Sequence, residues 1–168
     1  IAAHLSSALA RYGPTLHLSS ANLEQSLAKH EIAQIPPDAP ASIAIVHWLN
    51  EQETSYRYIV YEADPIASHW SARCIRQADC VLLVGDADAA SDLSAIERTL
   101  LTDQVLRSVP CKLALLHSPD TVRPGGTQRW LEARHVSNHY HVRRDNQDDM
   151  ARMARLLIGR GIGMVLSG

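Results

Sequence analysis

Short apolar runs, separated by helical stretches, constrain the fold of this chain more than any other feature. A strand that is covered on both faces loses its alternation of polar and apolar residues, and such runs are predicted to be buried strands. The predicted strands are residues 58–61, 80–84, 112–116 and 162–166, with a weaker one at 15–18. Strands that alternate with helices form βαβ units. We therefore predict an α/β fold of three layers, a mostly parallel sheet with helices on both faces.

Helical periodicity fills the intervals between these runs. Leu5, Leu9 and Tyr12 share one face of a first predicted helix, which Gly13 and Pro14 end. A second helix is predicted to start at Asp64 as N-cap and Pro65 as first helical residue, and its apolar residues recur every four positions: Ile66, Trp70, Cys74 and Ala78.

Two further helices and one loop complete the predicted order. Leu93, Ile96 and Leu100 form a stripe, with Asp92 or Ser94 as cap and Glu97 completing a capping box. A last helix is predicted over residues 147–159, with an apolar face of Met150, Met153, Ala154 and Leu157. The proline-rich residues 34–41 are predicted to form a surface loop.

Composition narrows the setting. The three cysteines, Cys74, Cys80 and Cys111, form no CxxC pair, which favours reduced thiols in the cytoplasm. No apolar run approaches the roughly 20 residues of a membrane span. Residues 129–168 hold 7 basic and 4 acidic side chains, against 9 and 14 in residues 1–128. This imbalance indicates either a solvated face or a surface for an anionic membrane or acidic partner. No nucleic-acid partner is expected.

Polar residues gather where the predicted strands end. In open α/β sheets, ligands bind beyond the carboxyl ends of the strands, so these residues are candidates for a nucleotide or metal site. The alternative is that Asp and Ser accumulate at strand ends because they cap helices and form turns. The residues are Glu62, Asp64, Asp86, Asp88, His117 and Ser118, and the first three are the candidate cofactor ligands.

Three histidines have a spacing that suits zinc. His135, His139 and His141 form an H-x₃-H-x-H pattern, and zinc accepts three imidazoles plus water. However, His139 and His141 alternate as strand residues do, and no fourth ligand lies nearby in the sequence. A short strand or hydrogen-bonded loop is therefore the preferred interpretation.

Catalytic motifs are missing from the printed sequence. It contains no GxxxxGK[ST] phosphate loop and no GxSxG nucleophile turn. The glycines of residues 159–168 follow a predicted helix and precede a strand, the reverse of a dinucleotide site. We therefore predict no catalytic residue and no cofactor in this chain.

The stretch HLSSALARYGPTLHLSS, with Glu62 at the position of the acidic Walker B residue, resembles the chromosome-partitioning ATPases. This resemblance implies a P-loop-NTPase-like fold. The chain departs from that family because it lacks a visible phosphate loop, and because Ser19 and Ser20 replace the expected aspartate. These departures oppose ATP hydrolysis.

A second resemblance spans almost the whole chain. The chain is similar to the neuropathy-target-esterase family of patatin-like phospholipases in the stretches ALARYGPTLHLSS, YRYIVYEAD, HWSARCIRQADCVLLVGDAD, QRWLEARHVSNHYHVR and DDMARMARLLIGRGIGMVLSG. In that family this region precedes the catalytic domain. Met164, Val165, Leu166 and Gly168 match the strand and first glycine of its oxyanion loop. The resemblance implies an α/β domain over residues 1–158, followed at 159–168 by a linker and the first strand of a patatin-like catalytic domain.

Two functions follow as hypotheses. In the first, the chain is a non-catalytic module that links upstream cyclic-nucleotide-binding-like domains to the parent's patatin catalytic domain, and the parent contacts a membrane surface. In the second, it is a nucleotide-binding or hydrolysing domain of the partitioning-ATPase type. A GK[ST]-containing loop in front of Ile1 would favour the second.

Overall fold

The computed structural model describes residues 1–102, 105 and 108–160. The strands are β1 (Thr15–Leu18), β2 (Tyr58–Tyr61), β3 (Val81–Asp86), β4 (Cys111–His117) and β5 (Asn138–Arg143). The helices are α1 (Ala2–Leu9), α2 (Ser20–Ser26), η1 (Ile32–Gln34), α3 (Ser42–Ser55), α4 (His69–Gln77), α5 (Ala95–Leu100), α7 (Thr127–Leu131) and α8 (Gln147–Leu157).

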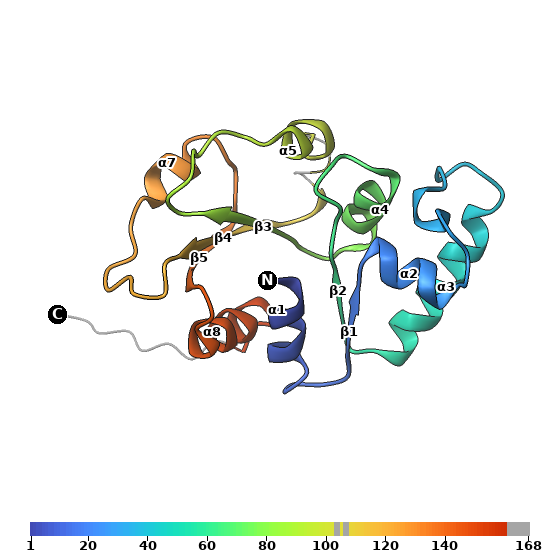
Figure 1. Cartoon of the computed structure of the whole chain (residues 1–168), viewed down its shortest axis with the longest axis horizontal. Coiled ribbons are helices and arrows are strands. Elements are labelled where there is room, and N and C mark those ends of the chain that lie inside the picture. Colours follow the sequence, from blue (N-terminus) through green and yellow to red (C-terminus); the bar gives the residue numbers. More distant parts are fainter. Residues whose placement is uncertain (103–104, 106–107, 161–168) are drawn as a thin grey trace.

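Every hydrogen-bonded pair of described strands is parallel, which confirms the predicted α/β class. They form two ladders, β1-β2 and β3-β4-β5 (Figure 1). A single sheet was the expectation, but no ladder of hydrogen bonds joins β2 to β3 in the described part of the chain. α4 lies in the connection between β2 and β3 and so links the two ladders along the chain.

Helices cover both faces of the strands, as predicted. Ala114 and Leu116 of β4 pack on one face in a cluster with residues of α1 and α8. Leu113 and Leu115 pack on the opposite face against Trp130 of α7. The β1-β2 pair packs against α2, α3 and α4 through a separate cluster (Figure 1). This alternation of side chains gives the three layers.

The helix starts follow ordinary capping chemistry. Ser94 caps α5, and Glu97 completes the predicted capping box. Asn146 caps α8, whose buried residues include Met150 and Met153, as predicted. The cap satisfies N–H groups of the first turn that have no partner within the helix.

The predicted start of α4 is wrong. The N-cap is Ser68, whose hydroxyl accepts from the amide of Ser71, and the helix begins at His69 rather than at Pro65. Ile66 consequently lies outside the helix and is exposed. Trp70 and Cys74 are buried on its inner face, as predicted.

The proline-rich loop is confirmed. Residues 35–41 form turns between η1 and α3, largely exposed. The predicted strand at 162–166 lies outside the described residues, so the domain boundary at 158 stays a prediction. No helix among residues 1–102, 105 and 108–160 combines the length and apolar composition needed to cross a bilayer.

Candidate functional site

Asp64 lies just beyond the carboxyl end of β2 and is fully engaged by other side chains. Its Oδ1 accepts from Ser20 Oγ at 2.7 Å. Its Oδ2 accepts from Ser68 Oγ at 2.6 Å and from Gln34 Nε2 at 2.8 Å. Burial alone would raise the pKa of Asp64, but these hydrogen bonds outweigh it and hold the pKa below the ordinary value.

These contacts give Asp64 a structural role. The three donors belong to the starts of α2 and α4 and to η1, so one ionised carboxylate joins the nearby start of α4 to two segments that are distant in sequence. Hydrogen bonds to a charged acceptor are stronger than those between neutral groups. A metal ion or nucleotide would have to displace these donors.

Glu62, the second strand-end acid, forms a partly exposed hydrogen bond with a histidine. Its Oε2 lies 2.6 Å from His17 Nε2 of β1. Its backbone carbonyl accepts from Trp70 Nε1 at 2.8 Å. Ser19, where the partitioning ATPases carry an aspartate, caps α2 through the amide of Asn22.

Asp86 belongs to the other sheet. Its Oδ2 lies 3.0 Å from Arg144 Nη2, and both side chains are about half exposed. Its Oδ1 accepts from the amide of Asp88 at 3.2 Å, a turn contact. The candidate acids are therefore distributed over two sheets. In the described part of the chain, no group of three or more His, Cys, Asp or Glu side chains is arranged to hold a metal ion.

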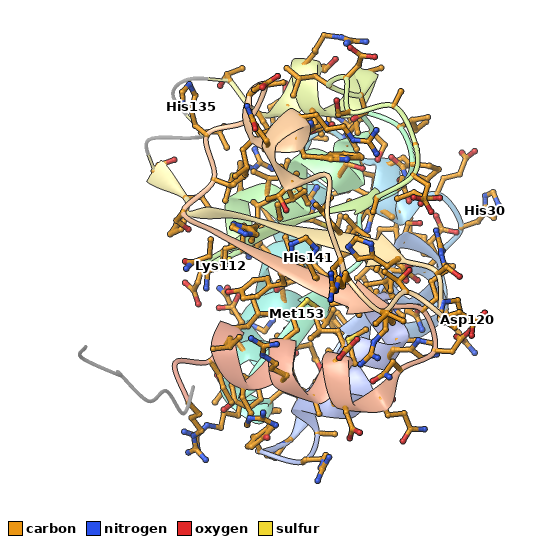
Figure 2. All side chains as sticks on the ribbon, turned by 90° about the vertical axis from the view of Figure 1, so that its left-hand side faces the viewer. His30, Lys112, Asp120, His135, His141 and Met153 are labelled. Atoms are coloured by element: carbon orange, nitrogen blue, oxygen red, sulfur yellow. The ribbon has the colours of Figure 1, made fainter. Side chains whose placement is uncertain are left out.

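The structure brings together a different histidine set from the predicted one. His141 lies on β5, and its Nδ1 is 2.8 Å from Nε2 of His117 at the end of β4. Its Nε2 is 3.0 Å from Thr127 Oγ1. His139 stacks edge-on against His141 with ring centroids 5.7 Å apart. His135 is exposed and stands well away from His141 (Figure 2).

Burial explains the electrostatics of this histidine pair. His117 is 4% exposed. Burial first, and then the neighbouring rings of His117 and His139, lowers the pKa of His141 below 6.5. Both nitrogens of His141 have hydrogen-bond partners, and these contacts connect β5 to His117 of β4 and to Thr127 at the start of α7.

The three thiols are shielded. Cys74 and Cys111 are buried and Cys80 is half-buried, and all three are reduced. Burial raises the pKa of the Cys74 thiol to about 12. A thiolate is the nucleophilic form of cysteine, so Cys74 is inert at neutral pH.

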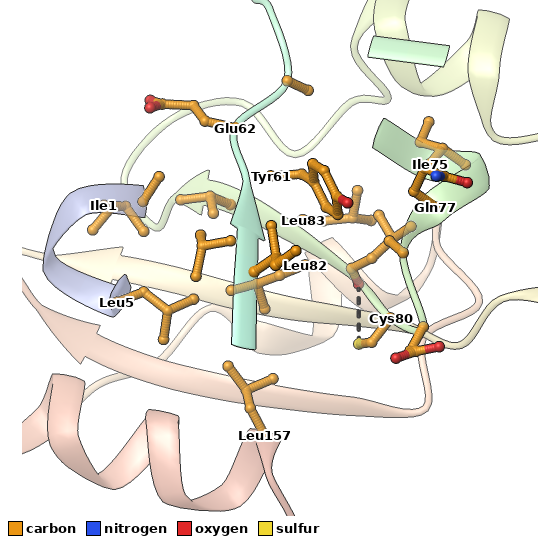
Figure 3. A pocket seen from close by; sticks show the side chains of 18 of the residues that line it. Ile1, Leu5, Tyr61, Glu62, Ile75, Gln77, Cys80, Leu82, Leu83 and Leu157 are labelled. Carbon is orange, nitrogen blue, oxygen red and sulfur yellow. Dashed lines mark hydrogen bonds between the residues drawn. The ribbon is translucent and has the colours of Figure 1, made fainter. Parts of the chain in front are cut away.

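A cavity of about 860 Å³, not anticipated from the sequence, separates the two sheets. Figure 3 shows Leu82 and Leu83 of β3 across the cavity from Tyr61 of β2, with Ile1 and, in α1, Leu5 on one side. Its other lining side chains are mostly apolar. The sequence carries only an indirect sign of this cavity. β2 and β3 are about as apolar as β4, but among the described strands each has one neighbouring strand where β4 has two.

Parallel strands with helices between them place the chain in the class of α/β domains. The family described as "Neuropathy Target Esterase family P-loop like domain" matches residues 1–159, and the chain belongs to this family.

Named relatives agree with this assignment. The chain is 33% identical to rat patatin-like phospholipase domain-containing protein 7, with 99% of the chain and 14% of the relative aligned. It is 30% identical to human patatin-like phospholipase domain-containing protein 6, over 98% of the chain and 13% of the relative. It is 38% identical to lysophospholipase NTE1 of Cryptococcus neoformans, over 84% of the chain and 8% of the relative. The chain thus spans a small part of these relatives. No solved structure gives a significant match.

Proposed function

We propose that this chain is a non-catalytic α/β module of a patatin-like phospholipase or esterase, in which it links upstream sensor domains to the serine hydrolase domain. The observation that carries this proposal is the family match over residues 1–159. In addition, the chain spans at most 14% of the length of the relatives described above. The relatives are named as a phospholipase or lysophospholipase, and in this proposal that activity belongs to the parent protein.

The chemistry of the strand ends supports a non-catalytic role. Asp64 is held by three side-chain donors, and Glu62 by His17. Acyl transfer needs an activated nucleophile and an oxyanion hole, and the printed sequence has no GxSxG turn. Two side proposals accompany the main one: the parent is cytoplasmic, and it contacts a membrane surface.

Deletion in the parent protein tests the linking role. We expect a parent that lacks residues 1–158 to keep hydrolysing lysophosphatidylcholine but to lose the response of its rate to ligands of its upstream domains. The control is a parent in which a flexible linker of equal span replaces the domain. An unchanged response in both proteins would contradict the linking role.

The isolated chain tests the non-catalytic role independently. We expect no turnover of a short-chain nitrophenyl ester or of lysophosphatidylcholine. Turnover that is abolished by a substitution within residues 1–168 would overturn this proposal.

The alternative is a nucleotide-binding domain, which the words "P-loop like" in the family description favour. The sequence that leads into Ile1 distinguishes the two functions. A loop with GK[ST] there would supply the backbone cradle and lysine that hold phosphates.

A further inference from the structure

The cavity between the two sheets lies along their edges. Successive side chains of a strand point to opposite faces, so a cavity against one face touches every second residue. Here every residue of 58–61 and of 80–84 lines the cavity (Figure 3). β2 and β3 therefore present their edges to it.

The backbone of β2 leaves donors on this edge. The amide of Tyr58 donates to the carbonyl of Pro14 at 3.2 Å and so points toward β1. Successive amides of a strand point to opposite edges, so those of Ile59 and Tyr61 point toward the cavity.

The backbone of β3 does the same from the other side. The amide of Val81 donates to the carbonyl of Pro110 at 3.0 Å, toward β4. The amides of Leu82 and Val84 consequently point toward the cavity. Among the described residues, the facing edges of β2 and β3 thus have no ladder partner, and an unpaired edge is a template for a further strand.

The exposure of β2 and β3 also indicates that a neighbouring strand is missing beside them. β2 (YIVY) and the first part of β3 (VLLV) are as apolar as strands buried on both faces. Yet all of β2 is only half-buried, and Val84 is 46% exposed. β4, which has a strand on each side, is almost entirely buried.

The N-terminus is placed to supply the missing neighbour. Ile1 and Leu5 line the cavity, together with Glu62 beyond the carboxyl end of β2. Figure 1 places the N-terminus beside the gap between the sheets. A segment that crosses the cavity and ends at Ile1 would run in the same direction as β2, because Glu62 beyond the carboxyl end of β2 lines the cavity together with Ile1. With α1 and β1 it would form a strand–helix–strand unit, the usual connection of parallel strands.

We propose that this cavity is a strand-binding slot, filled by the extended apolar segment that leads into Ile1 in the full-length protein. The segment hydrogen-bonds to both edges and joins β1-β2 and β3-β4-β5 into one parallel sheet. The rat and human relatives are about seven to eight times longer than the region that they share with this chain, which leaves ample chain for such a segment. This proposal holds whether or not the domain is catalytic.

Residue-level amide hydrogen exchange tests the slot. The 168-residue chain is compared with the same polypeptide started about 15 residues earlier, enough for one strand of roughly five or six residues and its connection. We expect the amides of Ile59, Tyr61, Leu82 and Val84 to exchange at least about tenfold more slowly in the longer protein. The amide of Val81, already bonded to Pro110, serves as internal control and should change less.

A pair of variants makes the test specific for a strand. Proline in the centre of the added segment removes a ladder donor and should restore fast exchange at the four amides, whereas alanine at the same position should not. Equal exchange rates in the shorter and longer proteins would overturn the proposal. Light scattering shows whether the 168-residue chain forms a dimer. If it does, and if these amides are protected in the dimer, the slot binds a second copy of the chain and the proposal is overturned as well.

Discussion

Arg134 Nε lies 2.7 Å from Glu97 Oε1, and the two side chains are only 3% and 12% exposed. The guanidinium also donates to the backbone carbonyls of Ser91, Asp92 and Trp130. Burial would raise the pKa of Glu97, but the hydrogen bonds from Arg134 and Ser94 outweigh it and lower the pKa. One buried cation therefore connects the capping box of α5 to the end of α7.

Replacement of Arg134 by methionine should lower the free energy of unfolding by about 3–5 kcal/mol, because it leaves the carboxylate of Glu97 and three carbonyls without their donor. Urea denaturation measures the change. Arg76→Met, at an exposed position of α4, is the matched control and should cost less than about 0.5 kcal/mol. Similar losses in both variants would show that the buried pair contributes little.

Gly85→Ala should destabilise the protein by about 1–3 kcal/mol, the usual cost of an overpacked core. A Cβ at Gly85 would lie 2.5 Å from ring atoms of the buried Trp130, so the indole would have to move. Gly125→Ala is the control, since a Cβ there meets nothing within 4 Å. Thermal unfolding compares the two, and a Gly85 variant as stable as the Gly125 variant would refute the close approach.

Stability should fall as the pH drops below about 6.5, partly because of His141. The folded state lowers the pKa of His141 from 6.5, so the unfolded chain binds the proton more readily. The neutral ring contributes fully above 6.5, and its contribution is lost as the pH falls toward the folded-state pKa. Unfolding measured between pH 5 and 8 should show a shallower pH dependence in His141→Asn than in the original chain. His135→Asn, at an exposed position, should keep the original slope.

ATP and GTP should show no micromolar affinity for the chain, with or without magnesium. The acids that would serve such a site, Glu62 and Asp64, are engaged by His17 and by three side-chain donors. Isothermal titration calorimetry is the measurement. A magnesium-dependent dissociation constant near 1 μM, about −8 kcal/mol, would contradict the prediction.

Local patterns were sufficient to predict most elements of the fold. The bounds of β1 and β2 match the predicted runs to the residue, because Gly13 and Pro14 precede the first run and Glu62 follows the second. The start of α4 was not predictable in this way. Asp64 followed by Pro65 has the pattern of a helix start, but the carboxylate is held by Ser20 and Gln34, which are distant in sequence.

The histidine pair was missed for a similar reason. The strand register pairs Leu115 with His141 and His117 with Arg143, so His117 and His141 are diagonal neighbours on one face. Spacing along one segment suggested His135 as the partner, whereas the partner comes from β4. Register between strands is a tertiary property that a single segment does not encode.

The apolar core is divided among three clusters. Leu18, Ile45 and Trp70 belong to a cluster that shares no buried member with those on the two faces of β4. Units with separate cores can lose their structure at different temperatures, and the all-or-none description of unfolding then fails. In a calorimeter, the heat absorbed by this chain should therefore exceed the van't Hoff enthalpy obtained from the steepness of its melting curve.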